Sequence, residues 1–345
     1  MNNPGEQQHF QRILIARLSS MGDIVLTTPL IRVLRRRFSE ARIDFVVKWE
    51  FAELLHSNPY LTNVYAYDSR TGVHGLFVLA RQLRSHRYEL FVDLHNNYRT
   101  NLLRFLTYPG RTVTFSKQIV KRTLLVKTGI NLYGKILQVP DRYVKTLQPF
   151  GIENDGKGLE LFPTEAQWIK VQSIFRRHHL GDESLAIGLG PIAAHPLKQW
   201  PRFAELGQEL VQRYGARILL FGGPPDVQQV QAIAAQIPNA PIVLCGQLSH
   251  LESAAALQRC ALYVGNDTGT VHMATAMQRK VVAIFGPTVE EFGFYPYSAQ
   301  SFVVSKPLSC RPCTHTGKRR CKIKTHACMQ EITVAEVVEA VEKVF

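Results

Sequence analysis

The loop NDTG (residues 266–269) places an acid, a hydroxyl group and a glycine between two apolar stretches. Residues 260–264 before it are apolar and partly β-branched, which is typical of a buried parallel strand, and the small residues 270–276 can open a helix. Free N–H groups at a helix start favour phosphate, and Gly269 lets the backbone approach a ligand closely. The pattern predicts a diphosphate site. The alternative is that Asp267 or Thr268 only caps the helix.

A second loop of this kind, RLSSMGD (residues 17–23), again separates a strand pattern from a helix pattern. Asp23 is expected near the start of that helix, where its carboxylate can emerge beside Gly22. A carboxylate in this position can remove a proton from a hydroxyl group as a general base, or it can be an N-cap. Ser20 and Gly22 are expected to shape the loop and to hydrogen-bond a sugar or a phosphate.

A third candidate is Lys198 in the motif KQWP (residues 198–201), which follows the irregular stretch 190–196. Its ammonium group is expected at the mouth of a second sheet, where a cation can offset the charge of a departing anion. A lysine that is only solvated is the alternative. His272 lies one turn into the helix after NDTG, where it can contact the same anion or only pack.

The elements that must position these loops alternate between strand and helix patterns, which predicts doubly wound parallel sheets with ligands at the carboxyl ends of the strands. In the first half we expect strands at 13–18, 43–47 and 90–94 and a helix at 24–37. The pattern restarts after a helix at 164–179. Strands are expected at 185–189, 217–221, 242–244, 262–264 and 281–285, with helices at 203–214 and 227–237.

The length of 345 residues predicts two domains, placed at 1–170 and 171–330, followed by a C-terminal segment 331–345. That segment contains an amphipathic helix, expected to pack back on the first domain. Residues 1–150 contain 22 Lys or Arg and 10 Asp or Glu, a balance of +12, whereas the remainder is nearly neutral. A basic first half indicates an anionic partner: nucleic acid, a phosphorylated glycolipid or the membrane surface. Because no nucleic-acid-binding module is recognisable, nucleic acid is not expected.

The motifs SSMGD, KQWP, FGGPPD, NDTGTVHMA and FGPT occur in this order between about residues 13 and 328. In order and spacing the chain resembles the ADP-heptose:lipopolysaccharide heptosyltransferases of glycosyltransferase family 9. The resemblance implies an α/β fold of the GT-B type, with two Rossmann-like domains facing across a cleft. It also implies inverting transfer of a heptose, with the acceptor in the first domain and the nucleotide sugar in the second.

The resemblance assigns a role to each candidate residue. It implies that Asp23 is the general base and that Lys198 contacts the donor's phosphates. Ser20 and Gly22 would bind the acceptor. Donor binding would involve Asp226, Leu248, Asp267, Thr268, Gly269 and His272. Of these, Thr268 and Gly269 offer amides to the diphosphate and Asp267 bonds sugar hydroxyls. The family often has Glu where this chain has Asp226, whose shorter side chain weakens that assignment.

Several patterns bear on metals and other cofactors. No Asp-x-Asp triplet occurs, so the metal-holding carboxylates of the other major glycosyltransferase architecture are missing and a metal-independent enzyme without cofactor is expected. The set Cys310-x2-Cys313-x7-Cys321-x6-Cys328 could hold zinc as four thiolates. Since similar sets recur in this family without an established catalytic metal, a structural role is the interpretation. Residues 188–190, GLG, lack the third glycine of a dinucleotide fingerprint.

The expected partners are ADP-heptose, a lipopolysaccharide or glycolipid acceptor and, peripherally, the inner membrane surface. Residues 1–9 lack the pattern of a secretory signal, so a cytoplasmic location is expected. One alternative is a transferase of the same fold with another nucleotide sugar or acceptor. Others are a nucleotide-sugar isomerase, for which no acid and base pair is found, and a non-catalytic glycolipid-binding or assembly protein.

Overall fold

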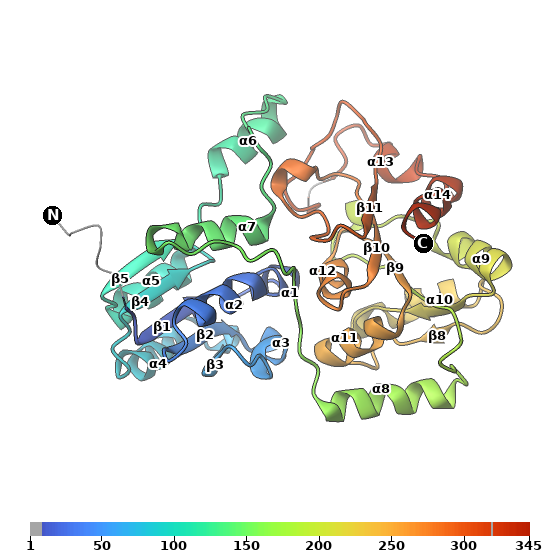
Figure 1. Ribbon diagram of the computed structural model, residues 1–345. Coiled ribbons are helices and arrows are strands. Elements are labelled where there is room, and N and C mark those ends of the chain that lie inside the picture. Colours follow the sequence, from blue (N-terminus) through green and yellow to red (C-terminus); the bar gives the residue numbers. More distant parts are fainter. Residues whose placement is uncertain (1–8, 319) are drawn as a thin grey trace. The chain divides into compact units, whose positions relative to one another are not determined.

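The computed structural model describes residues 9–318 and 320–345 (Figure 1). The chain forms two compact units. The first unit ends at Lys117 and resumes over Val139–Lys157, and the second contains Gln118–Gln138 and Gly158–Phe345. Residues 1–8, which make up most of the N-terminal stretch without a secretory-signal pattern, lie outside the described residues.

The first unit contains a parallel sheet in the order β3-β2-β1-β4-β5. The strands are β1 (Arg12–Ala16), β2 (Arg42–Lys48), β3 (Asn63–Tyr67), β4 (Leu90–Asp93) and β5 (Arg111–Thr114). The central strands are buried almost throughout because helices cover both faces, which accounts for their continuous apolar runs. The strand order reverses between β1 and β4, and the carboxyl ends of these two strands form the usual ligand position of such sheets.

Helices of the first unit form two layers. The helices are α1 (Met21–Val25), α2 (Thr28–Arg37), α3 (Glu53–His56), α4 (Gly72–Arg84), α5 (Tyr98–Thr107) and α7 (Val139–Val144). Leu76 and Leu83 of α4 and Leu103 of α5 share one core with Leu14 of β1 and Phe91 of β4. α2 packs against α7.

The single helix expected at 24–37 is in fact two. α1 begins at Met21, three residues earlier than expected, and ends at Val25, and α2 begins at Thr28. Pro29 lies in the first turn of α2, where its missing N–H group costs nothing. Inside one continuous helix the same proline would remove a backbone hydrogen bond, so the chain restarts there.

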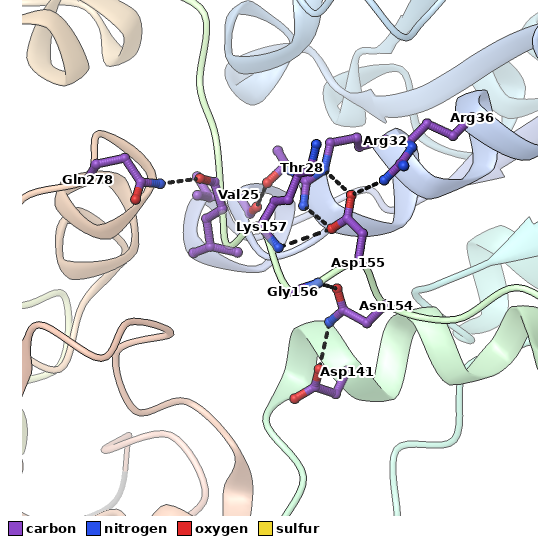
Figure 2. Close-up of polar contacts among 11 residues, drawn as sticks. Val25, Thr28, Arg32, Arg36, Asp141, Asn154, Asp155, Gly156, Lys157 and Gln278 are labelled. Carbon is purple, nitrogen blue, oxygen red and sulfur yellow. Dashed lines mark hydrogen bonds and ion pairs between the residues drawn. The ribbon is translucent and has the colours of Figure 1, made fainter.

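The last segment of the first unit is tied to α2 by a buried ion pair. Asp155 accepts hydrogen bonds from Nε and Nη2 of Arg32 at 2.9 and 2.7 Å, and from Nη1 of Arg36 at 3.0 Å (Figure 2). Gly156 and Gly158, on either side of Lys157, both adopt positive φ, a conformation that glycine tolerates best. This segment therefore leaves the first unit from a fixed point on α2.

The second unit contains a parallel sheet in the order β11-β10-β9-β6-β7-β8. The strands are β6 (Ala186–Gly190), β7 (Arg217–Leu220), β8 (Ile242–Val243), β9 (Leu262–Asn266), β10 (Lys280–Ile284) and β11 (Ser301–Val304). Numbered from β6, this is the 3-2-1-4-5-6 order of Rossmann folds, with the reversal between β6 and β9. β11 was not foreseen, whereas the other five match expected strands within two residues.

Eight α-helices are described for the second unit: α6 (Ile119–Thr128), α8 (Glu165–Arg177), α9 (Phe203–Tyr214), α10 (Val227–Ala234), α11 (His250–Arg259), α12 (Gly269–Ala276), α13 (Ala327–Gln330) and α14 (Val334–Val344). The expectation that the C-terminal helix packs on the first domain is wrong. Val337 and Val341 of α14 are buried with Ile284 of β10 and Val304 of β11, because the apolar stripe of α14 fits the second sheet.

The division of the chain also differs from the expected boundary at residue 170. The change of unit falls at Lys157 and Gly158, before α8 rather than within it. In addition, residues 118–138 leave the first unit and pack on the second, where Leu125 and Val126 of α6 meet Phe292. The periodicity of strand and helix patterns does not reveal that a segment within one unit packs on the other.

Candidate active site

The loop after β1 presents Asp23 at the start of α1. Ser20 is the N-cap of this helix and Asp23 is its third residue, so Asp23 is not itself the N-cap. One carboxylate oxygen, Oδ2, accepts hydrogen bonds from the backbone N–H of Ser20 at 3.1 Å and from its hydroxyl at 2.8 Å. This capping box fixes the carboxylate at the carboxyl end of β1. Gly22, which lies between Ser20 and Asp23 in the sequence, is buried in the first turn of α1.

Arg17 holds the other oxygen of Asp23. Its Nη2 lies 2.7 Å from Oδ1, and both side chains are largely buried. The same guanidinium donates to the carbonyls of Ser19 at 2.8 Å and of Leu94 at 2.7 Å, so its position is fixed from two loops. Burial alone would raise the pKa of Asp23, but the charge of Arg17 and the Ser20 bonds outweigh it and lower the pKa below its usual value. The carboxylate is therefore ionised at neutral pH.

The loop after β4 completes this part of the first unit. His95 accepts the backbone N–H of Leu18 at its Nδ1, at 3.1 Å, which links the loops that follow β1 and β4. Burial, with the nearby charges of Arg17 and Lys117, lowers the pKa of His95 to about 3. The ring is thus neutral at physiological pH, with its proton on Nε2. Its bond to the loop is insensitive to pH in that range.

In the second unit, Lys198 and Asp267 form an ion pair where the sheet order reverses. The ammonium nitrogen lies 2.6 Å from Oδ2 of Asp267 and 3.3 Å from its backbone carbonyl. The hydroxyl of Thr288, in the loop after β10, donates to the same Oδ2 at 2.8 Å. Loops from β6, β9 and β10 therefore meet at this carboxylate.

Asn266 connects the loops that follow β6 and β9 through buried hydrogen bonds. It is fully buried at the end of β9, and its Oδ1 accepts the backbone N–H of Trp200 at 3.0 Å. Its amide nitrogen donates to the carbonyl of Pro191 at 2.8 Å. The indole N–H of Trp200 in turn donates to the carbonyl of Ile332 at 2.9 Å. These bonds fix the KQWP motif, and with it Lys198, against NDTG.

Helix α12 follows Asp267 of this ion pair closely in the sequence. Thr268 is its N-cap and Gly269 is its first residue. The Thr268 side chain makes no capping hydrogen bond to any residue that the structure describes. The hydrogen bonds therefore do not support Thr268 as a simple side-chain cap, and the first amides of α12 can donate hydrogen bonds to an anion. His272 lies one turn further on, buried within the helix.

Two expected donor residues lie further along the same edge of the sheet. Asp226 follows β7 at the start of α10, and its Oδ2 accepts the backbone N–H of Gly223 at 2.9 Å. This bond shapes the GGPP turn. Leu248 is half-buried in the loop between β8 and α11. Neither residue contacts the Lys198 and Asp267 pair through any hydrogen bond described for this chain.

The glycines of the GLG stretch serve packing. A Cβ atom added at Gly190 would lie 1.8 Å from the hydroxyl oxygen of Tyr263, and one at Gly188 would lie 3.0 Å from the same ring. Tyr263 is fully buried on β9, next to β6. The absence of side chains on β6 therefore makes room for this ring, which explains the two glycines without a dinucleotide.

The four C-terminal cysteines are free thiols, and Cys313 and Cys328 are buried. Within residues 9–318 and 320–345, no group of three or more His, Cys, Asp or Glu side chains is arranged to hold a metal ion. Burial, reinforced by the neighbouring thiols, raises the pKa of Cys328 to about 11. In the same ranges, no helix has the length and apolar character needed to cross a membrane.

Each unit thus gathers its own expected residues at one edge of its sheet. Ser20, Gly22 and Asp23 lie together in the first unit, and Lys198, Asp267, Thr268 and Gly269 lie together in the second. Sequence reasoning gave no role to Arg17, Thr288 or Asn266, which hold these groups in place. All three belong to motifs noted in the sequence, RLSSMGD, FGPT and NDTG. The motifs themselves do not show which residues these three contact.

Comparison with known proteins identifies the family. Lipopolysaccharide heptosyltransferase 3 of Escherichia coli K12 is 25% identical over 283 residues, which cover 79% of this chain and 81% of that protein. The crystal structure of a family 9 glycosyl transferase from Veillonella parvula matches with a TM-score of 0.82 at 26% identity over 97% of both chains. E. coli heptosyltransferase WaaC with ADP matches with a TM-score of 0.70 at 18% identity, over 97% of this chain and all of that one.

These matches confirm the expected GT-B fold of two Rossmann-like domains. The sequence model of glycosyltransferase family 9 (heptosyltransferase) matches residues 76–324, well over half of the chain. The chain therefore belongs to glycosyltransferase family 9, the heptosyltransferases, and is a glycosyltransferase.

Proposed function

We propose that this enzyme transfers heptose from ADP-heptose to a phosphorylated inner-core lipopolysaccharide acceptor, with inversion at the anomeric carbon and without a metal ion or other cofactor. The relatives support both substrates. One is a lipopolysaccharide heptosyltransferase, and another was solved with ADP. The observation that carries the proposal is the uncapped start of α12 beside the Lys198 and Asp267 ion pair.

The second unit binds the donor in this proposal. The backbone amides of the N-cap Thr268 and of Gly269, the first residue of α12, donate hydrogen bonds to the diphosphate, which also interacts favourably with the helix dipole. Lys198 has three N–H donors on a flexible stem, so it can bond phosphate oxygens while staying near Asp267. Asp267 then accepts hydrogen bonds from sugar hydroxyls. His272 supports the phosphates from one turn into the helix.

Asp226 and Leu248 line the outer part of the donor site in this proposal. They follow β7 and β8; β7 lies beside β6 on the side away from β9, and β8 lies beside β7. This is the side on which a Rossmann-type sheet accommodates the nucleoside of a bound nucleotide. Asp226 would contact the ribose and Leu248 would contact the adenine. Because the side chain of Asp226 is shorter than that of Glu, it can bond the ribose only if the ribose lies close to it.

The first unit supplies the base. Asp23 takes the proton of the acceptor hydroxyl as that oxygen forms a bond to the anomeric carbon. At the same time the bond from the anomeric carbon to the diphosphate oxygen breaks, and its electron pair leaves with ADP. A carboxylate with a lowered pKa is a weak base, so proton transfer accompanies bond formation instead of preceding it. Ser20 and Gly22 hold the acceptor near this carboxylate.

The location proposed for the enzyme follows from its acceptor. Because the proposed acceptor is a glycolipid, we place the enzyme in the cytoplasm with peripheral contact to the inner membrane. The basic first 150 residues suit a phosphorylated acceptor and an anionic surface, and no nucleic acid is expected as a partner.

The donor assignment is tested by calorimetry with ADP, UDP, GDP and dTDP in EDTA. We expect a preference for ADP, which Lys198→Ala should weaken about 10- to 100-fold, the equivalent of one charge-assisted hydrogen bond. Lys170→Ala is the matched control, because Lys170 also pairs with a carboxylate at 2.7 Å, on α8 of the same unit. Preference for another nucleotide would keep the transferase and replace its donor.

The base assignment is tested by transfer from ADP-heptose to a heptose-deficient lipopolysaccharide core. Asp23→Asn should reduce kcat at least about 100-fold, since general-base catalysis contributes roughly that much or more, while ADP binding stays unchanged. The amide keeps the shape and most hydrogen bonds of the carboxylate. Full activity of Asp23→Asn would exclude Asp23 as the base and favour a non-catalytic role for this loop.

A further inference from the structure

The helices α4 and α5 belong to the first unit (Figure 1). Both carry large apolar side chains that are exposed to water. We call their exposed surface the α4–α5 face, and its apolar members are Val73, Phe77 and Val78 of α4 with Tyr98, Phe105 and Tyr108 at α5. The two helices pack against each other over the same side of the sheet. Several large apolar groups gathered on adjacent helices indicate a surface that contacts a partner.

α5 shows most clearly that this exposure is not a by-product of folding. Its inner side buries Thr100, Leu103 and Thr107, and Leu102 and Leu106 pack partly buried against the same core. The aromatic side chains at its C-terminal end lie outside this core: Phe105 is 77% exposed and Tyr108 is 81% exposed. Folding the first unit therefore does not require these aromatic rings, and an outward partner accounts for them.

The charges around this face are almost all positive. Residues 71–117 contain seven Lys or Arg and only two acids, Glu89 and Asp93, whereas Arg70 just before them is paired with Asp68 at 2.8 Å. Glu89 is paired with Arg12 at 2.7 Å, and Asp93 is fully buried at the end of β4. Among the described residues of this stretch, no acid is thus left to balance the exposed arginines. The partner must be anionic and must also accept apolar groups.

The topology of the first unit places cationic and aromatic side chains at the same edge of its sheet. Both helices run antiparallel to the parallel strands that they connect, so their C-terminal ends lie at one edge of the sheet. Arg81 and Arg84 at the end of α4 are exposed, as are Phe105 and Tyr108 at the end of α5. Aromatic rings beside arginines suit the boundary between lipid headgroups and acyl chains.

We propose that the α4–α5 face docks on the surface of an anionic lipid bilayer. A second copy of this chain is a poorer occupant, because two such faces would bring like charges together. The inference deepens the membrane contact of the proposed function by naming its surface. Its test uses vesicles with neither donor nor acceptor, so its failure would leave the proposed glycosyl transfer untouched.

The experiment is co-sedimentation of the full chain with vesicles of phosphatidylcholine alone or mixed with phosphatidylglycerol, at about 0.1 M salt, where the Debye length is about 10 Å. We expect binding that needs phosphatidylglycerol and weakens with salt. Phe105→Ser with Tyr108→Asn should reduce the partition coefficient about tenfold or more. Asparagine is chosen because position 108 has a positive φ of 51°, which Asn tolerates. Arg81→Gln with Arg84→Gln should reduce it about fivefold for each arginine.

Matched controls lie on the second unit. Ile169, on α8, is 54% exposed, and Arg176 and Arg177 lie on the same helix. Ile169→Ser and the double Arg→Gln change there should leave vesicle binding unchanged. Circular dichroism and nucleotide binding confirm that each variant is folded. Equal binding to neutral vesicles, no binding to anionic ones, or equal losses in the α8 controls would each overturn the proposal.

Discussion

Replacement of Arg17 by methionine is the most direct test of how the first unit prepares Asp23. The change keeps an unbranched stem about as far as the Nε position but removes the guanidinium group, with its charge and all its hydrogen bonds. Asp23 then loses the partner 2.7 Å from Oδ1, and the carbonyls of Ser19 and Leu94 lose their donors. The capping bonds from Ser20 to Oδ2 remain. The carboxylate is thus still present but less firmly held.

The expected effect on stability follows from burial. The side chains of Arg17 and Asp23 are 9% and 17% exposed, so little solvent can replace the lost partner. Breaking such a pair should lower the free energy of unfolding of the first unit by about 3–5 kcal/mol. Asp23→Asn on the same background should recover part of the loss. The double-mutant cycle should give a coupling of about 2–3 kcal/mol, as for a hydrogen bond between charged groups.

The expected effect on pH dependence has a definite sign. The pKa of Asp23 is depressed in the folded protein, so its stabilising contribution is present above the unfolded pKa of about 3.9 and is lost as the pH falls through the lower folded pKa. Without Arg17, burial remains and raises the pKa. The acid limb of kcat/KM should therefore move to higher pH in Arg17→Met. Arg17→Lys should move it less, because the charge is kept.

The measurement is kcat/KM for transfer from ADP-heptose between about pH 5 and 8, together with urea unfolding at pH 7. Arg32→Met is the matched control, because Arg32 forms a similarly buried pair with Asp155, with side chains 5% and 9% exposed. It should destabilise the same unit without moving the acid limb. An unmoved limb in Arg17→Met, or equal movement in both variants, would refute the reasoning.

Three further predictions concern the supporting residues. Thr288→Val removes one hydrogen bond to Asp267 and should lower the free energy of unfolding by about 1 kcal/mol, measured as a fall in Tm. An unchanged Tm would show that this bond does not stabilise the fold. Gly190→Ala places a methyl group 1.8 Å from the Tyr263 hydroxyl and should cost about 1–3 kcal/mol in urea unfolding, partly restored by Tyr263→Phe. Asp155→Asn leaves two arginines of α2 without their charge partner and should destabilise the first unit by about 3 kcal/mol; a change below 1 kcal/mol would contradict the burial of this pair.

The alternation of apolar runs was enough to predict the two Rossmann-like sheets, because strands such as β1 and β9 are covered on both faces and read as continuous apolar segments. The same reasoning did not identify α5, because large apolar side chains, Tyr98 and Phe105, also occupy its exposed side and weaken its amphipathic pattern. Nor did it assign α14 correctly. An apolar stripe shows that a helix packs, but not on which sheet it packs.

The candidate site divides in the same way between what sequence can and cannot predict. Motif residues that follow strands were expected at the sheet edges, and Asp23 and Asp267 lie there. Their partners depend on which strands are neighbours. Thr288 reaches Asp267 because β10 lies beside β9, although 21 residues separate them in the chain. Spacing along the sequence cannot predict a contact that is created by strand order.

Both units present an acid paired with a cation where strand order reverses, but the two cations are held differently. Arg17 is anchored by two backbone carbonyls besides Asp23, at 2.7 and 2.8 Å, and its planar group offers a fixed fork of donors. Lys198 has a flexible stem, and its backbone contact with Asp267 is 3.3 Å long. Thr288 keeps its own bond to that carboxylate. In the proposed reaction this difference matters, because a base needs a fixed orientation, whereas the charge on the leaving diphosphate needs a cation that can follow it.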